Sequence, residues 1–144
     1  PLKGAYSMHD IARSARFFGL PYRQPSTFPI PTQHAARAFL WLHGRSPAQA
    51  KAFGLAAYRA YFVDDVNISD LGAVLDIAAG QGVDRVELSA VLAGSEIKAQ
   101  LAAEVEQGIA RGVFGSPFVI VDGEPFWGAD RLPQLERWLQ DGPF

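Results

Sequence analysis

The order of the secondary-structure signals constrains this chain most, because the signals change character after Gly112. Before that point apolar residues recur at helical spacing, whereas Phe118–Val121 is an apolar run rich in β-branched residues. Asp122–Gly123 is typical of a two-residue hairpin turn, Pro125–Trp127 is the predicted second strand, and a last helix is predicted over Ala129–Gln140. A two-stranded hairpin is marginally stable by itself, so further strands or a helical layer must cover it.

Six helices are predicted ahead of the hairpin, and Ser, Thr or Asp residues at capping positions mark most of their starts. A loop separates the first two, since four prolines between residues 21 and 31 exclude a helix there. The sixth helix carries an apolar stripe at intervals of four residues, Ile97, Leu101, Val105 and Ile109. The predicted helices are Ser7–Gly19, Thr32 (as cap) to His43, Pro47–Val63, Ser69 or Asp70 to Gly80, Asp84 (as cap) to Gly94, and Ser95–Arg111.

The composition excludes several classes of protein. With 144 residues, 49% hydrophobic and 19% charged, the chain suits one domain, or one domain with an insertion, and is too apolar for a disordered segment. A net charge of −2 argues against a protein that binds nucleic acid by neutralising phosphates. The chain has no cysteine, which excludes disulfides, thiolate zinc sites and a Cys-x-x-Cys pair from these residues, and its three histidines lack metal-ligand spacing. The uncharged apolar stretch from Gly112 to Val121 is too short to span a membrane.

The first residues of the chain lack the features of a natural N-terminus. The chain opens on Pro1-Leu2-Lys3-Gly4, without a methionine and without the apolar core of a signal peptide. We therefore expect the polypeptide to begin upstream of Pro1.

Two short segments around the hairpin are candidates for ligand binding. Gly115-Ser116-Pro117 precedes the first strand, and we predict a cis Ser116–Pro117 bond, with the backbone of Ser116 available to an extended peptide-like ligand. The N-terminus of the last helix offers free N–H groups to a carboxylate, and Asp130 beside it could take an ammonium group. Each segment also has an ordinary interpretation, as a trans loop-to-strand turn and as a helix cap.

Together these segments carry a family resemblance. Gly112 to Leu132 closely resembles the C-terminal signature of the 2-hydroxychromene-2-carboxylate isomerases, which belong to the DsbA-like, kappa-class glutathione transferase group. Phe126-Trp-Gly-Ala-Asp-Arg131 is the most specific part. The resemblance extends in order over essentially the whole chain, through Pro1–Tyr6, His9-Asp10, Leu20-Pro21, Phe28–Thr32, Arg59–Val63 and Ile68–Asp70.

The resemblance implies an α/β, thioredoxin-like fold with a large all-helical insertion. Residues 1–111 would be the mostly helical insertion domain and residues 112–144 the C-terminal β-β-α half of the thioredoxin domain. The first β-α-β unit, with the family's catalytic serine, would lie upstream of Pro1, so no catalytic residue is assigned within this chain. The implied cofactor is glutathione and no metal is implied; its contacts would be Lys3, Ser116 before the cis-proline Pro117, Ala129, and Asp130 at the γ-glutamyl ammonium.

The implied activity is the glutathione-dependent interconversion of 2-hydroxychromene-2-carboxylate and trans-o-hydroxybenzylidenepyruvate. The resemblance further implies a cytoplasmic homodimer that acts on a small aromatic substrate in aromatic-compound degradation, without nucleic-acid or membrane partners. A kappa-class-like glutathione transferase, a DsbA-like thiol-disulfide oxidoreductase and an inactive relative that binds glutathione remain alternatives. Three positions depart from the family pattern: Ser116 replaces a larger aliphatic residue, Ala129 replaces a hydrogen-bonding side chain, and Pro31 replaces an asparagine, which affects the expected aromatic-substrate pocket.

Overall fold

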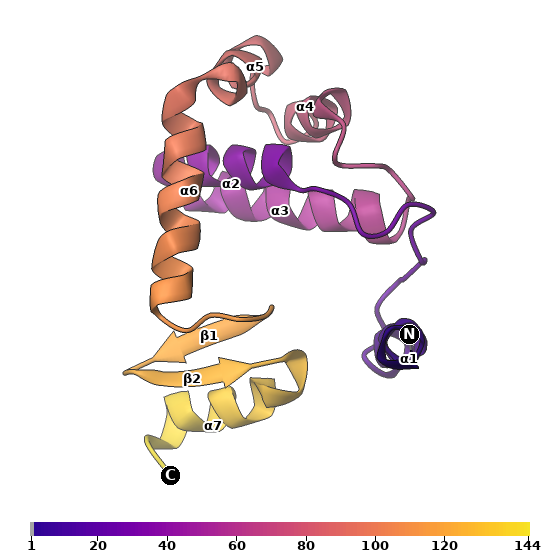
Figure 1. Cartoon of the computed structure of the whole chain (residues 1–144), viewed down its shortest axis with the longest axis vertical. Helices are drawn as coiled ribbons and strands as arrows, with labels where there is room; N and C mark the ends of the chain where they lie inside the picture. Colours follow the sequence, from indigo (N-terminus) through magenta and orange to yellow (C-terminus); the bar gives the residue numbers. More distant parts are fainter. Residues whose placement is uncertain (1) are drawn as a thin grey trace. The chain divides into compact units, whose positions relative to one another are not determined.

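The computed structural model describes residues 2–144, except for the side chains of Leu2, Lys3 and Ala5. The chain forms two compact units, Pro1–Leu101 and Ala102–Phe144, with the division inside α6. The elements follow in the predicted order: α1 (Leu2–Phe17), α2 (Gln33–Arg45), α3 (Pro47–Phe62), α4 (Leu71–Ala79), α5 (Arg85–Ala93), α6 (Ser95–Ala110), β1 (Phe118–Val121), β2 (Glu124–Trp127), η1 (Ala129–Arg131) and α7 (Leu132–Asp141) (Figure 1). Within residues 2–144, none of the helices is long and apolar enough to cross a membrane.

The first unit has its core between α2, α3, α4 and α5. Figure 1 shows α2 and α3 side by side, and α4 packs against α2, α3 and α5. Small residues on the facing sides of α2 and α3, such as Ala38 and Ala50, allow the two helices to approach closely. Each large side chain buried there contributes about 1.5–3 kcal/mol to stability. The largest fully buried side chains are Phe53, Leu42, Leu88 and Val74.

The proline-rich loop is held against the end of α3 by polar contacts. The backbone N–H of Ser26 donates to Oδ1 of Asp65 at 2.7 Å, and Arg23 pairs with the other carboxylate oxygen at 3.1 Å. The bond from the Ser26 backbone, with the charge of Arg23, holds the pKa of Asp65 below its ordinary value. The hydroxyl of Tyr61 donates to the carbonyl of Thr27 at 2.8 Å. These bonds give an extended segment without regular structure a defined position.

Several predicted helix ends are confirmed. The side chains of Asp70 and Asp84 accept hydrogen bonds from the backbone N–H groups of Ala73 and Glu87, at 2.8 and 2.7 Å, and so cap α4 and α5. Gly19 ends α1 with φ of +66°, a conformation that favours glycine.

Other predicted ends are wrong. Ser7 does not cap the first helix, because α1 already begins at Leu2 and Ser7 lies inside it. Thr32 precedes α2, but its φ and ψ of −116° and 16° give no capping bond from its side chain. The last α-helix begins at Leu132 and not at Ala129, since residues 129–131 form a 3₁₀ turn and Pro133 suits the first turn of a helix.

The second unit contains the end of α6, the β1–β2 hairpin and α7. The strands pair antiparallel with Phe118 opposite Trp127, and the predicted hairpin turn lies at Asp122–Gly123. Both turn residues have the positive φ that a type I′ turn requires. Figure 1 shows α7 beside β2. Phe126 of β2 packs against Trp138 of α7, with ring centroids 5.7 Å apart. Among the described residues of this unit only Phe126 counts as buried, at 8% exposure.

The apolar stripe predicted along the sixth helix is buried over part of its length. Ile97 is buried and Leu101 half-buried, whereas Val105 and Ile109 are exposed. The stripe therefore covers a core only near its N-terminal end within the described chain. The assignment of residues 1–111 and 112–144 to an insertion and a thioredoxin half stays a prediction.

Candidate functional site

The hairpin brings the two predicted binding segments together. Because Phe118 pairs with Trp127, the residues just before β1 lie beside those just after β2. The backbone N–H of Gly128 donates to the carbonyl of Pro117 at 2.9 Å, which extends this pairing by one bond. The Ser116–Pro117 peptide bond is cis, as predicted. Ser116 and Asp130, fourteen positions apart, are thus carried by adjacent segments of one compact unit.

The backbone of Ser116 is available to a ligand. Over residues 2–144, neither its N–H nor its C=O makes a backbone hydrogen bond. Ser116 and Pro117 are both exposed. A backbone N–H and C=O that an exposed residue leaves unpaired can bind a peptide-like ligand in the manner of an added strand.

Trp127 covers the segment that leads to Ser116. A Cβ atom on Gly115 would overlap the Trp127 indole, so glycine is required for this close approach. The indole also packs edge-on against Phe114, with centroids 4.9 Å apart, while remaining 52% exposed. The contact between Gly115 and Trp127 is not evident from the sequence, because it depends on the strand register.

Asp130 lies in the 3₁₀ turn before α7. Its side chain is 74% exposed, and Oδ2 accepts a hydrogen bond from Arg131 at 2.8 Å. Its other carboxylate oxygen lies over Gly128, which has φ of +99° and where a Cβ would overlap that oxygen. Gly128 and Arg131 therefore orient the carboxylate, and neither was a predicted site residue. Ala129 is exposed and has only backbone groups to offer a ligand.

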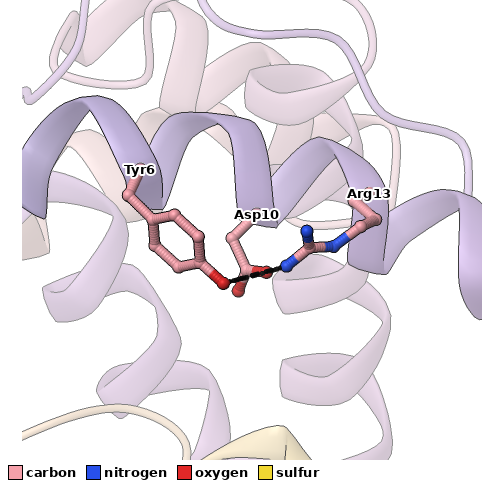
Figure 2. A network of polar contacts seen from close by, with 3 residues as sticks. All are labelled: Tyr6, Asp10 and Arg13. Atoms are coloured by element: carbon pink, nitrogen blue, oxygen red, sulfur yellow. Dashed lines mark hydrogen bonds and ion pairs between the residues drawn. The ribbon is translucent and has the colours of Figure 1, made fainter.

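The remaining candidate, Lys3, belongs to α1, but its side chain lies outside the described part of the structure. The same helix carries a polar network that Figure 2 shows in detail. Arg13 donates to the hydroxyl of Tyr6 at 3.0 Å and forms an ion pair with Asp10. Both hydrogen bonds raise the pKa of Arg13, and the bond to Tyr6 has the larger effect. Spacings of four and three residues place these three side chains on one face of the helix, and this spacing is visible in the sequence.

Comparison with known proteins identifies the relatives of this chain. A model of the DsbA-like thioredoxin domain family matches residues 1–140. The 2-hydroxychromene-2-carboxylate isomerase of Sphingobium xenophagum is 31% identical over 134 residues, which are 93% of this chain and 67% of that protein. Glutathione S-transferase kappa 2 of Caenorhabditis elegans is 24% identical over 156 residues, covering 100% of this chain and 69% of the transferase.

The solved structures agree with this relationship. A structure of 2-hydroxychromene-2-carboxylate isomerase superposes with a TM-score of 0.86 at 23% identity, over 96% of this chain and 66% of that one. The chain thus spans about two thirds of the length of these relatives. The thioredoxin-like fold predicted from the sequence is confirmed. This chain belongs to the DsbA-like thioredoxin family, among the relatives of the 2-hydroxychromene-2-carboxylate isomerases.

Proposed function

We propose that this protein is a glutathione-dependent isomerase that interconverts 2-hydroxychromene-2-carboxylate and trans-o-hydroxybenzylidenepyruvate. The observation that carries the proposal is the pairing of the Ser116 and Asp130 segments through the Gly128–Pro117 hydrogen bond. This pairing supports a single site, in which the backbone of Ser116 binds a peptide-like ligand and the carboxylate of Asp130 binds the ammonium group of that ligand. The 31% identity to an isomerase of that name supports the reaction.

The described residues fit the γ-glutamyl end of glutathione. Asp130 offers an exposed carboxylate held by Arg131, and a charge-assisted bond to the ligand's ammonium would stabilise the complex by about 1.5–3 kcal/mol. Gly128 has no Cβ that would displace the Asp130 carboxylate. Ser116 offers backbone groups to the peptide part of the ligand, and its side chain adds a polar wall. Lys3 is proposed to hold an anionic group of the cofactor or the substrate.

Glutathione, when bound, supplies the nucleophilic sulfur that this cysteine-free chain lacks, and it is recovered at the end without net redox change. A free thiol has a pKa of about 8.5, so the protein must favour the thiolate at neutral pH. We propose that a serine on a segment preceding Pro1 does this, as the resemblance implies. Asp130 contacts the far end of the tripeptide, so its contribution is to binding and orientation.

Asp130→Ala tests this assignment. We expect the variant to weaken glutathione binding about tenfold or more, measured by calorimetry, with a smaller effect on the turnover of bound enzyme. Asp141→Ala is the matched control, because Asp141 is also an exposed carboxylate of this unit that pairs with an arginine, Arg137, at 3.5 Å. Equal glutathione affinities in wild type and Asp130→Ala would contradict the proposed site.

The match to a kappa-class glutathione transferase supports a second candidate, the conjugation of glutathione to an electrophile. Both reactions use the same glutathione site, so the substrate distinguishes them. Isomerase activity is followed by the absorbance of the ring-opened product from 2-hydroxychromene-2-carboxylate, and transferase activity by conjugation of 1-chloro-2,4-dinitrobenzene. Turnover of only the second compound would replace the isomerase assignment with the transferase.

We further propose a cytoplasmic homodimer. Exposed apolar side chains in the second unit support self-association, among them Phe114 and Ile109. Sedimentation equilibrium measures the state directly, and a monomer at micromolar concentration would contradict this part of the proposal.

A further inference from the structure

Arg37 of α2 differs from every other arginine of the chain in its surroundings. Its side chain is half-buried, whereas all the other arginines are exposed. Within the part of the chain that the structure describes, Arg37 has no carboxylate partner and no side-chain hydrogen bond. The least exposed arginine therefore carries a charge that nothing compensates. The arginines that do pair with a carboxylate are Arg13, Arg23, Arg45, Arg59, Arg85, Arg131 and Arg137.

The guanidinium group of Arg37 is buried at one end and open at the other. Its Nε atom is buried and has no hydrogen-bond partner among the described residues. The two terminal nitrogens are not buried, so their N–H groups reach solvent. A cation that has lost part of its hydration attracts an anion more strongly than a fully exposed one, because the local dielectric constant is lower. The open end of Arg37 is therefore the position at which an anion would compensate the charge.

His34 lies one helical turn before Arg37 and has a similar arrangement. Its Nδ1 atom is buried without a partner among the described residues, whereas its Nε2 atom is not buried. Side chains three positions apart lie on the same face of a helix, with Cβ atoms about 5–6 Å from each other. Nε2 of His34 and the open end of Arg37 can therefore contact one small ligand. Since a histidine readily gains a proton near neutral pH, the pair can supply two positive charges.

The sequence around this pair provides no negative charge. Residues 11–63, which include all of α2 and α3, contain neither aspartate nor glutamate. The side chain of Thr32 does not cap α2, and the first turn of this helix has no acidic residue. Because the N-terminal end of a helix carries a partial positive charge, basic side chains near it are unfavourable unless an anion is present.

The acidic residues of the neighbouring helices are engaged elsewhere. The helices α4 and α5 both contact α2. The carboxylates at their starts act as helix caps, and those within them pair with other arginines. The caps are Asp70 and Asp84, and the pairs are Asp76 with Arg85 and Glu87 with Arg45. The charge of Arg37 is thus left for a partner that is not one of these side chains.

We propose that Arg37 and His34 bind a phosphate group, either as inorganic phosphate or as part of a small phosphorylated molecule. The terminal nitrogens of Arg37 offer parallel N–H donors that match two oxygens of a phosphate, and Nε2 of His34 can donate to a third oxygen. A doubly charged oxyanion suits two basic side chains better than a carboxylate with one charge does. The inference concerns the first unit alone and is independent of the proposed function.

Inorganic phosphate is the probe, and amide chemical shifts measure its binding at pH 7 and constant ionic strength. We expect the amides of α2 around His34 and Arg37 to shift, with a Kd of about 1 mM or tighter. Arg37→Gln should weaken this binding about tenfold or more. The matched control is Arg111→Gln, because Arg111 also lacks a carboxylate partner among the described residues but is exposed. This control should bind phosphate like wild type.

Two further variants test the geometry of the pair. Arg37→Lys keeps the charge but loses the planar fork, and it should weaken phosphate binding several-fold. This variant also replaces Arg37→Gln if the latter does not fold. His34→Asn should weaken binding a few-fold. Glycerol 3-phosphate distinguishes the two sources of the phosphate group, since tighter binding than inorganic phosphate indicates a phosphorylated molecule and weaker binding indicates free phosphate.

Several outcomes would overturn the inference. One is that phosphate shifts no amide of α2, or shifts only amides of the second unit. Another is that Arg37→Gln and Arg111→Gln bind phosphate equally well. A third is that acetate, which carries one charge, binds as tightly as phosphate at the same ionic strength.

Discussion

Replacing Gly115 by alanine is the sharpest test of the packing that places Ser116. The added Cβ would meet three atoms of the Trp127 indole, two of them at 2.9 and 3.0 Å and the third closer still. The φ of Gly115 is not in the left-handed region, so alanine fits the backbone and only the overlap opposes it. The indole must therefore move away from Gly115. Since Trp127 is half-exposed and can turn outward, we expect a cost of about 1–2 kcal/mol, at the low end for overpacked positions.

Gly108→Ala is the control and should have the opposite effect. Gly108 lies inside α6, and its added Cβ would come only to 3.9 Å from Val113, an ordinary contact. Removing a glycine from a helix interior stabilises by about 0.5–1 kcal/mol. Urea unfolding followed by tryptophan fluorescence measures both variants, and the displaced indole should also change the emission of folded Gly115→Ala. Unchanged stability and emission in Gly115→Ala would refute the proposed role of this glycine.

Three further predictions concern the first unit. Asp84→Ala should lose about 1 kcal/mol because its side chain caps α5, whereas Thr32→Ala should lose almost nothing, as thermal unfolding by circular dichroism will show. Asp65 has a lowered pKa when folded, so its contribution to stability is present above its ordinary pKa and lost as the pH falls below about 4. Asp65→Asn should flatten this acid-side decline in urea unfolding, and an unchanged slope would contradict it. Tyr61→Phe should cost about 0.5–1.5 kcal/mol by removing the bond to Thr27, and a neutral result would show that this bond does not stabilise the loop.

The order and type of the elements could be predicted from the sequence because their signals are local. A cap such as Asp70 acts on an N–H three residues away, and Asp122–Gly123 sets the hairpin turn through its own φ values. The errors have the same origin. Ser7 and Thr32 are residues of the capping type, but a residue type does not specify the backbone angles that a cap requires.

The candidate site was predicted in part for the same reason. Ser116 and Asp130 stood out in the sequence, and the hairpin turn between them predicts that their segments come together. The residues that shape the site did not stand out. The contact of Gly115 with Trp127 depends on strand register, and the position of Gly128 under Asp130 depends on its φ of +99°.

Burial was decided only by the tertiary structure. Ile97 and Ile109 occupy equivalent positions of one helical stripe, yet Ile97 is buried and Ile109 is 69% exposed. The spacing of apolar residues defines which side of a helix is apolar, but burial depends on which other segment arrives there. The close packing of α2 and α3 has the same cause. Small residues permit close helix contact in any sequence, but only the tertiary arrangement buries Ala38 of α2 and Ala50 of α3 completely.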